Sequence, residues 1–297
     1  MKTKPLTVLS YGAGQDSTAI LLKLIHDKKF RDEYAPGDLL VVMSDTGNEH
    51  AHTYRHVKFT KDLCAKHGIE FVMLTPDLGY HGNSHDLISY WRKTKSVGSK
   101  RFQKSCTDHL KIRPIYKFLD RLLGERLSPG KNFTRPKQAT KNYLQEIGQV
   151  KVLIGIAKGE ERRVMDPTKR KEVWMRTFKY EYPLIDCGLD RKGCQDLISS
   201  LGYDVPFPSN CVLCPFMNEI ELLWLKRFNP SALNLWIEIE NDKIQNNLHK
   251  GKENFGVWGT KLLPEKILDV TKKFGHMTDD ELNEYKFSHG HCVNSKY

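Results

Sequence analysis

The chain has no long hydrophobic run. Its apolar stretches, such as Ala19–Leu22, are far shorter than the ~20 residues that a membrane-spanning helix needs. The opening residues Met1–Pro5 lack the apolar segment of a signal peptide, and no internal repeat or low-complexity tract follows. With 297 residues, 39% of them hydrophobic, the chain can build a core, which excludes global disorder. We therefore expect a cytoplasmic globular protein that does not enter a membrane.

A disulfide framework and a zinc-protease motif are also missing. The seven cysteines are an odd number, and in a reducing compartment they indicate free thiols, redox groups or metal ligands. The twelve histidines show no His-Glu-x-x-His spacing. A disulfide-stabilised secreted domain and a zinc protease of that class are therefore not expected.

Acidic residues are scarce in one part of the chain only. The stretch Asp86–Lys141 contains fifteen basic and four acidic residues, whereas the rest of the chain has 32 of each sign. The net charge of +11 thus belongs to this stretch, which also carries aromatic residues. Such a segment favours a polyphosphate partner, either a nucleotide or the backbone of DNA or RNA. The alternative is a solvated loop that keeps the protein soluble.

Short apolar runs alternate with helical patterns in the first part of the chain. The runs that predict strands are Leu6–Leu9, Leu39–Met43, Glu70–Leu74 and Lys151–Gly155. A further segment, Tyr182–Ile185, fits either one more strand or a packed loop. This alternation predicts an α/β fold, a parallel twisted sheet with helices on both faces in a Rossmann-like arrangement.

The character of the sequence changes at about residue 191, where cysteines cluster. Two helices are expected beyond this point, over Glu219–Arg227 and Pro230–Ile244. We therefore divide the chain into an α/β domain and a C-terminal helical region that contains a Cys-x-x-Cys pair. The expected boundaries are 1–190 for the first, with a basic insertion over 86–141, and 191–297 for the second.

The turn Ser10–Ser17 joins the first strand to the first helix. Its glycines let main-chain N–H groups approach an anion, and the following helix start adds N–H donors and a partial positive charge. The dinucleotide fingerprint fails at Ser17, and no Gly-Lys-Ser/Thr of a Walker loop follows. The turn therefore indicates phosphate binding. The alternative is an ordinary glycine turn in which Asp16 or Gln15 caps the helix.

Five motifs, in the same order, resemble those of a known family. The turn Ser10–Ser17 resembles the PP-loop of ATP pyrophosphatases, the adenine nucleotide alpha hydrolase-like superfamily. Four later motifs resemble the phosphoadenosine-phosphosulfate (PAPS) reductase-like branch of that superfamily. They are Ser44–Glu49, Cys106-x4-Lys111-x2-Pro114, Gly155-Ile156-x3-Glu160-x2-Arg163 and Cys211-x-x-Cys214-Pro215. The resemblance spans residues 6–240.

The resemblance implies that the turn holds an adenine nucleotide, either ATP with Mg²⁺ or a sulfonucleotide (PAPS or APS). The residues that it implicates in nucleotide binding are Ser10, Tyr11, Gly12, Gly14, Gln15, Asp16, Ser17, Asp45, Thr46, Gly155, Glu160 and Arg163. Its implied catalytic residues are Asp16, Cys106 and Lys111. For Glu160 and Arg163 the alternative is a solvated charged loop.

The chain departs from the family pattern at three places. Thr107 follows Cys106 where the iron–sulfur reductases carry a second cysteine. The segment Gly155–Glu160 lacks one Arg and one Asp of the family motif, and Gly290–Cys292 only partly matches the reductases' Glu-Cys-Gly tail. These departures argue against sulfonucleotide reduction itself.

The later cysteines are candidate metal ligands. Cys211 and Cys214 are spaced to bind one metal, with Cys194 and Cys106 as further ligands of a [4Fe–4S] cluster or, alternatively, Zn²⁺. The resemblance favours iron–sulfur. Cys292, with His289 and His291, competes for the fourth position. The other interpretations are a Cys211/Cys214 redox pair or buried, inert thiols.

Cys106 has a separate interpretation as a reactive thiol. It lies among Lys104, Lys111 and Arg113 just before a predicted helix, and both features stabilise a thiolate. Cys106 is thus a candidate nucleophile or persulfide carrier. Cys64, by contrast, is expected to pack in a core.

Three functions follow from these observations. The first is an ATP-dependent enzyme that adenylylates an acceptor, releases pyrophosphate and transfers sulfur, with DNA or RNA as the acceptor and a separate sulfur donor. The second is a PAPS or APS reductase that uses a thioredoxin-like reductant. The third is a nucleotide- or nucleic-acid-binding module without turnover.

Overall fold

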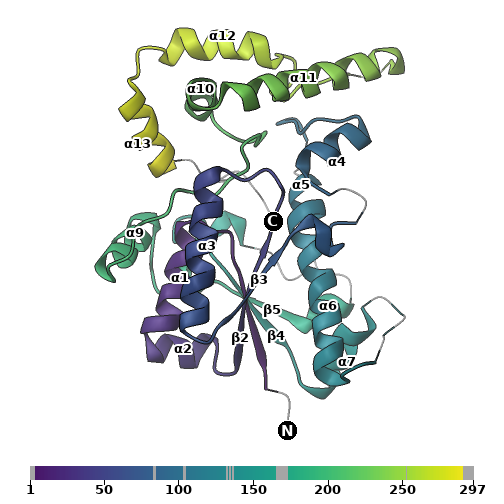
Figure 1. Ribbon diagram of the computed structural model, residues 1–297, viewed down its shortest axis with the longest axis vertical. Helices are drawn as coiled ribbons and strands as arrows, with labels where there is room; N and C mark the ends of the chain where they lie inside the picture. Colours follow the sequence, from purple (N-terminus) through teal and green to yellow (C-terminus); the bar gives the residue numbers. More distant parts are fainter. Residues whose placement is uncertain are drawn as a thin grey trace.

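The computed structural model describes residues 4–82, 85–102, 105–131, 133, 135, 137–164, 173–251 and 253–289. Its centre is a five-stranded, all-parallel sheet with the strand order β3-β2-β1-β4-β5 (Figure 1). The strands are β1 (Leu6–Ser10), β2 (Asp38–Ser44), β3 (Glu70–Leu74), β4 (Val150–Ile154) and β5 (Phe178–Glu181). The α/β fold class and the first four strands are confirmed.

Both faces of the sheet are covered by helices because its strands are apolar on both sides. Successive side chains of a strand point to opposite faces, and Val8 accordingly packs in one core cluster while Leu9 packs in the other. The helices that contribute to the Val8 cluster are α6 (Arg113–Leu127) and α7 (Gln138–Glu146). Those of the Leu9 cluster are α1 (Gln15–His26), α2 (Lys28–Tyr34), α3 (Ala51–Lys66), α8 (Pro183–Asp186) and α9 (Arg191–Ser200).

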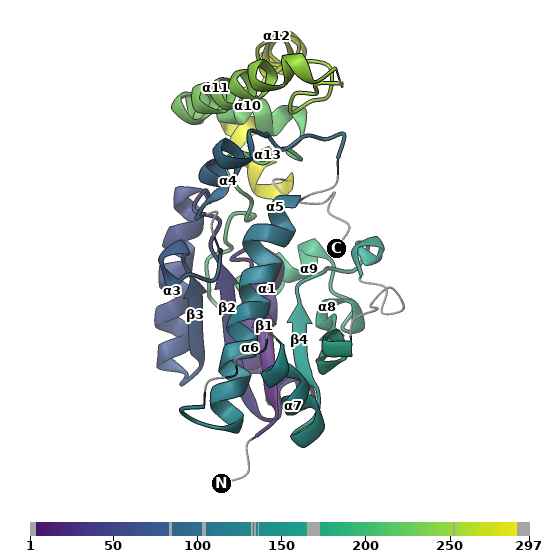
Figure 2. The same cartoon turned by 90° about the vertical axis from the view of Figure 1, so that its right-hand side faces the viewer.

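A third hydrophobic cluster lies beyond the carboxyl ends of the strands, where four C-terminal helices form a cap (Figures 1 and 2). Trp91 and Trp236 are fully buried in it. The helices that form it are α4 (Leu87–Thr94), α10 (Glu219–Phe228), α11 (Pro230–Asn247), α12 (Leu263–Phe274) and α13 (Asp279–His289). Short 3₁₀ turns cover Pro76–Leu78, Glu161–Arg163, Val173–Thr177 and Leu248–Lys250.

The structure differs from the expected organisation in three respects. Tyr182–Ile185 is not a strand, because Pro183 begins the short helix α8, and β5 ends just before it. Helix α9 packs on α1 in the core of the α/β part, so that part continues past residue 190. The basic stretch 86–141 is not one insertion, since α4 joins the C-terminal cap while α6 and α7 cover the sheet.

The strand order places a crevice between β1 and β4. From β1 the chain goes to β2 and β3 on one side, and it later returns to β4 and β5 on the other. At such a reversal the two connections diverge, and open α/β sheets bind ligands there, at the carboxyl ends of the strands. Among the described residues, no helix combines the length and the apolar character needed to cross a membrane.

Candidate functional site

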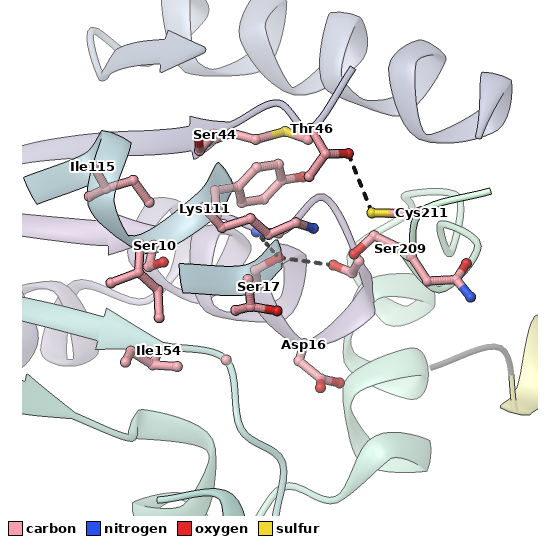
Figure 3. A pocket seen from close by; sticks show the side chains of 18 of the residues that line it. Ser10, Asp16, Ser17, Ser44, Thr46, Lys111, Ile115, Ile154, Ser209 and Cys211 are labelled. Atoms are coloured by element: carbon pink, nitrogen blue, oxygen red, sulfur yellow. Dashed lines mark hydrogen bonds between the residues drawn. The ribbon is translucent and has the colours of Figure 1, made fainter. Parts of the chain in front are cut away.

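A cavity of about 240 Å³ lies at this crevice, between the sheet and the C-terminal cap (Figure 3). Its walls come from the turn after β1, the ends of β2 and β4, the start of α6 and a long segment over 208–216. The predicted site residues that line it are Ser10, Tyr11, Gly12, Gly14, Gln15, Asp16, Ser17, Thr46, Cys106, Lys111, Gly155, Arg163, Cys211 and Cys214. Sequence patterns thus located the wall formed by the turn after β1 and part of the rest of the cavity.

The turn after β1 has the geometry of an anion-binding loop. Ala13 adopts a left-handed backbone with φ +57°, and Gly14 offers no side chain to cap α1. The first N–H groups of α1 therefore lack intrahelical acceptors at the cavity wall. The Ser17 hydroxyl accepts from Gly12 N at 3.3 Å and donates to Gly14 O at 3.2 Å, which fixes the loop.

Two glycines allow this loop to be packed closely from both sides. A Cβ on Gly155, just after β4, would lie 2.9 Å from Ser17 N. A Cβ on Gly14 would lie 3.0 Å from Ser209 Oγ and 3.3 Å from Ser209 N. Ser209 therefore lies directly over the turn after β1 and lines the cavity. Sequence reasoning missed Ser209 because it follows no recognisable motif.

Tyr11 and Gln15 serve the scaffold of the loop. The Tyr11 hydroxyl is buried and hydrogen-bonds Thr60 at 2.8 Å and Thr18 at 3.0 Å, and burial raises the pKa of the phenol. Gln15 Nε2 donates to Pro206 O at 3.0 Å. Their side chains are thus engaged in contacts within the protein, while both residues line the cavity.

A network of charges lies beside the helix start. Arg163 and Arg191 both form ion pairs with Glu160, and Arg191 lies 3.9 Å from Asp16 Oδ2. Burial raises the pKa of the Asp16 carboxyl, and Arg191 opposes that shift. Glu160 does not line the cavity but holds two arginines that do. Arg191, at the start of α9, was not predicted because its segment lies far away in the sequence.

Lys111 reaches the cavity from an unusual turn. Residues Asp108–Ile112 form a π-helical turn between α5 (Ser105–Thr107) and α6, a feature frequent at functional sites. Lys111 Nζ lies 3.1 Å from Glu49 Oε1, whose side chain is only 1% exposed. Thr46 donates to the same oxygen at 2.9 Å, and Cys211 Sγ lies 3.6 Å from it (Figure 3 shows the Thr46–Cys211 contact).

Asp45 has a structural role. Its Oδ1 accepts from Gly47 N and from the Tyr54 hydroxyl, both at 2.9 Å, which closes the turn after β2. Asp45 is not among the residues that line the cavity, whereas its neighbour Thr46 is. The carboxylate of Asp45 is therefore engaged within this turn.

The four predicted metal ligands are not brought together. Cys106, Cys211 and Cys214 line the cavity, but Cys194 is buried between α1 and α9 in a different core cluster. In the described part of the chain, no three His, Cys, Asp or Glu side chains are arranged to hold a metal ion. The predicted four-thiolate set does not fit, because Cys194 packs against α1. The alternative ligands Cys292 and His291 lie outside the described residues.

The cations expected to activate Cys106 are paired with carboxylates. Arg113 lies 2.6 Å from Asp108, Lys111 pairs with Glu49, and Lys104 is outside the described residues. Burial, with the Glu49 charge, raises the pKa of the Cys211 thiol. Cys64 is fully buried, as predicted.

Part of the basic stretch is used within the fold. Lys100 Nζ donates to Met217 O at 2.7 Å and lies 3.1 Å from the centre of the Trp258 ring. Burial lowers the pKa of Lys100 to about 8. The ammonium of Lys100 is therefore engaged in contacts within the fold. Arg101 remains exposed beside Phe255.

No protein-family model matches the chain, and no curated protein matches it in sequence.

Proposed function

We propose that the protein binds an adenine nucleotide in this cavity and uses ATP to adenylylate an acceptor, with release of pyrophosphate, ahead of sulfur transfer. One observation supports this proposal above the others. The phosphate loop, three cationic side chains and three thiols line one cavity at the sheet reversal. The cations are Lys111, Arg163 and Arg191.

The cavity has a polar and an apolar side. The phosphates fit the loop Gly12–Ser17, where N–H groups and a helix start favour negative charge. The apolar side chains fit a purine ring; they come from Ile112, Ile115, Tyr116, Leu119, Val152, Ile154 and Tyr180. A nucleotide would therefore lie across the end of the sheet, from the loop toward α6.

The first chemical step is attack of an acceptor oxygen on the α-phosphorus. An O–P bond to the acceptor forms, the bond to the β-phosphate oxygen breaks, and pyrophosphate leaves. Negative charge grows on the transferred and leaving groups. The loop N–H groups, Arg163 and Arg191 stabilise this charge. These donors are fixed before reaction by Glu160 and by the loop hydrogen bonds.

Mg²⁺ fits this site. Asp16 Oδ1 is buried at the cavity without a hydrogen-bond partner, and Mg²⁺ in nucleotide sites is bound through one or two carboxylates plus phosphates. Asp16 would hold the ion, which supplies charge neutralisation of the phosphates when bound.

The cavity thiols suit sulfur chemistry. Cys106, Cys211 and Cys214 line the cavity, and Figure 3 shows Cys211 on the side away from Asp16. A persulfide formed on one cavity cysteine by an external donor would attack the activated acceptor through its outer sulfur, and the bond to the acceptor oxygen breaks to release AMP. A second cavity thiol then attacks the cysteine sulfur of the resulting disulfide, which leaves the new sulfur on the acceptor and the two cysteines as a disulfide that an external thiol reduces. The exposed cations of the stretch 86–141 favour a phosphate-rich acceptor such as DNA or RNA.

The same thiols favour a second candidate, a PAPS or APS reductase. In that reaction a cavity cysteine attacks the sulfur of the sulfonucleotide, the S–O bond to the nucleotide phosphate breaks to release PAP or AMP, and a cysteine S-sulfonate is left. A thioredoxin-like thiol then attacks the cysteine sulfur and releases sulfite. The pairing of Lys111 and Arg113 with carboxylates counts against Cys106 as a pre-formed thiolate.

The deciding experiment measures products. Anaerobically purified protein is incubated with ATP, with and without DNA or RNA, and pyrophosphate is measured; sulfite is measured after incubation with PAPS and thioredoxin. Pyrophosphate release that is lost in Asp16→Asn and retained in Asp196→Asn, an exposed carboxylate of α9, supports the proposal. Sulfite release supports the reductase instead. Nucleotide binding without either product indicates a binding module.

A further inference from the structure

The last described helix, α13, contacts the cavity wall through a buried charge. Lys286 is 1% exposed, and its Nζ lies 2.9 Å from both Asn210 Oδ1 and Glu221 Oε1. Asn210 Nδ2 donates to the same Glu221 oxygen at 3.0 Å. Asn210 lines the cavity. The ammonium of α13 thus fixes the orientation of a cavity side chain.

The position of Glu221 makes this cluster rigid. Asn218 and Glu221 form a reciprocal capping box at the start of α10. A buried ammonium needs this complete set of acceptors, because an unpaired buried charge is costly. Lys286 therefore ties α13, the start of α10 and the wall segment 206–211 into one unit.

A second link joins α13 to the phosphate loop. Gln15, the first residue of α1, donates from Nε2 to Phe287 O at 3.4 Å as well as to Pro206 O. Gln195 of α9 donates to Gln15 Oε1 at 3.0 Å. Two consecutive residues of α13 therefore contact opposite sides of the cavity, the wall through Lys286 and the loop through Phe287.

Ser209 lies between these two links. It is placed against Gly12 and Gly14, with Ser209 Oγ 3.6 Å and 3.0 Å from the positions that a Cβ would take there. Its hydroxyl and N–H are thus close enough to the loop to contact an anion held by it.

We propose that Ser209 contacts the phosphates of the bound nucleotide, and that Lys286 is the positioning residue that holds Ser209 over the loop. This inference rests on the proposed nucleotide function of the cavity. In this arrangement α13 is a clamp that joins the loop Gly12–Ser17 to the wall segment 206–211. A nucleotide would bind between these two segments.

The test compares variants that break the clamp with one that does not. Lys286→Met and Asn210→Ala break the wall contact, and Asn210→Ala leaves the Lys286–Glu221 ion pair in place to maintain folding. Ser209→Ala removes the contact of the hydroxyl with the phosphates and keeps the main-chain N–H. The matched control is Lys226→Met, which cuts a similar tie between α10 and α12, from Lys226 Nζ to Thr271 Oγ1 at 2.8 Å.

Two measurements are made on each variant: the Kd for ATP by calorimetry, and hydrogen–deuterium exchange of the amides in 208–216. We expect Ser209→Ala to weaken ATP binding about 10-fold with unchanged exchange, since one hydrogen bond to a charged group is worth about 1.5 kcal/mol. Lys286→Met and Asn210→Ala should weaken ATP binding at least as much and accelerate exchange of the wall.

Each outcome bears on one part of the inference. If both clamp variants match Lys226→Met in exchange and in Kd, the positioning role of Lys286 is wrong. If the Kd for ATP is unchanged in Ser209→Ala, the proposed contact of the Ser209 hydroxyl with the phosphates is wrong. Wild-type protein that binds neither ATP nor PAPS overturns the proposed function, while the exchange data still decide whether α13 holds the wall.

Discussion

Lys111 Nζ lies 3.1 Å from the buried Glu49 carboxylate, so a cation from the π-helical turn before α6 meets an anion from the turn after β2 at the edge of the cavity. The same carboxylate accepts from Thr46 and contacts Cys211. Glu49 and Cys211 are also paired through their backbones, and Val212 N donates to Asn48 O at 2.7 Å. This carboxylate therefore connects the α/β sheet with the Cys-x-x-Cys segment.

Removing Lys111 alone should destabilise the fold. Lys111→Met leaves Glu49 buried without its cation, and we expect a loss of about 2 kcal/mol, below the range for fully buried pairs because Lys111 is 34% exposed. Adding Glu49→Gln should restore most of the loss. Urea unfolding measures both. Lys28→Met, from an exposed ion pair, should change little; an equal loss there would contradict the assignment.

Substitution of Gly155 should affect nucleotide binding more than folding. A Cβ in Gly155→Ala would meet Ser17 N at 2.9 Å and displace the loop, so we expect ATP affinity to fall by about 10-fold or more. Gly148→Ala, before the other end of β4, strains a φ of +121° without a close contact. It should lower the melting temperature and leave the Kd for ATP unchanged. Equal Kd values for both variants would argue against the close approach.

Acid should destabilise the contact between α3 and the C-terminal cap. Burial lowers the pKa of His50 from 6.5 to about 2 and that of His52 to about 4. Below pH 6.5 the unfolded chain binds protons that the folded chain does not, so the free energy of unfolding falls as the pH falls. Urea unfolding gives the free energy of unfolding at each pH between about 6.5 and 4. In His50→Gln this free energy should change with pH less steeply than in the wild-type protein, by about 1 kcal/mol per pH unit. An unchanged slope would show that His50 does not contribute.

ATP should protect the cavity thiols from alkylation. Cys106 and Cys211 line the cavity, whereas Cys187 is exposed elsewhere. We expect saturating ATP to slow the reaction of iodoacetamide with Cys106 at least several-fold and to leave Cys187 unaffected, as located by mass spectrometry. Protection of Cys187 as well would indicate a general change in stability. If ATP protects neither Cys106 nor Cys211, the nucleotide binds outside the cavity.

The sheet could be predicted from sequence because its signals are local. Runs such as Leu39–Met43 are apolar at every position, as strands buried on both faces must be, and the turn after β1 carries its glycines in a fixed pattern. The structure of Tyr182–Ile185 was harder to predict, because aromatic and apolar residues beside a proline fit a strand end as well as a helix start.

The second wall of the cavity could not be predicted. Ser209 and Arg191 lie in segments without a chemical motif, and only tertiary packing places them beside Gly14 and Asp16. The grouping of cysteines failed for the same reason. Cys194 has a spacing compatible with metal binding, but the hydrophobic face of α9 turns it toward α1.

The wall over 206–216 follows the last strand and is held by a helix that ends at His289. A chain growing on the ribosome therefore completes its sheet and its phosphate loop well before the opposite wall exists. Affinity for the nucleotide should arise late in synthesis, only after α13 has emerged and docked, so chains shortened before α13 should fold their sheet without acquiring the binding property.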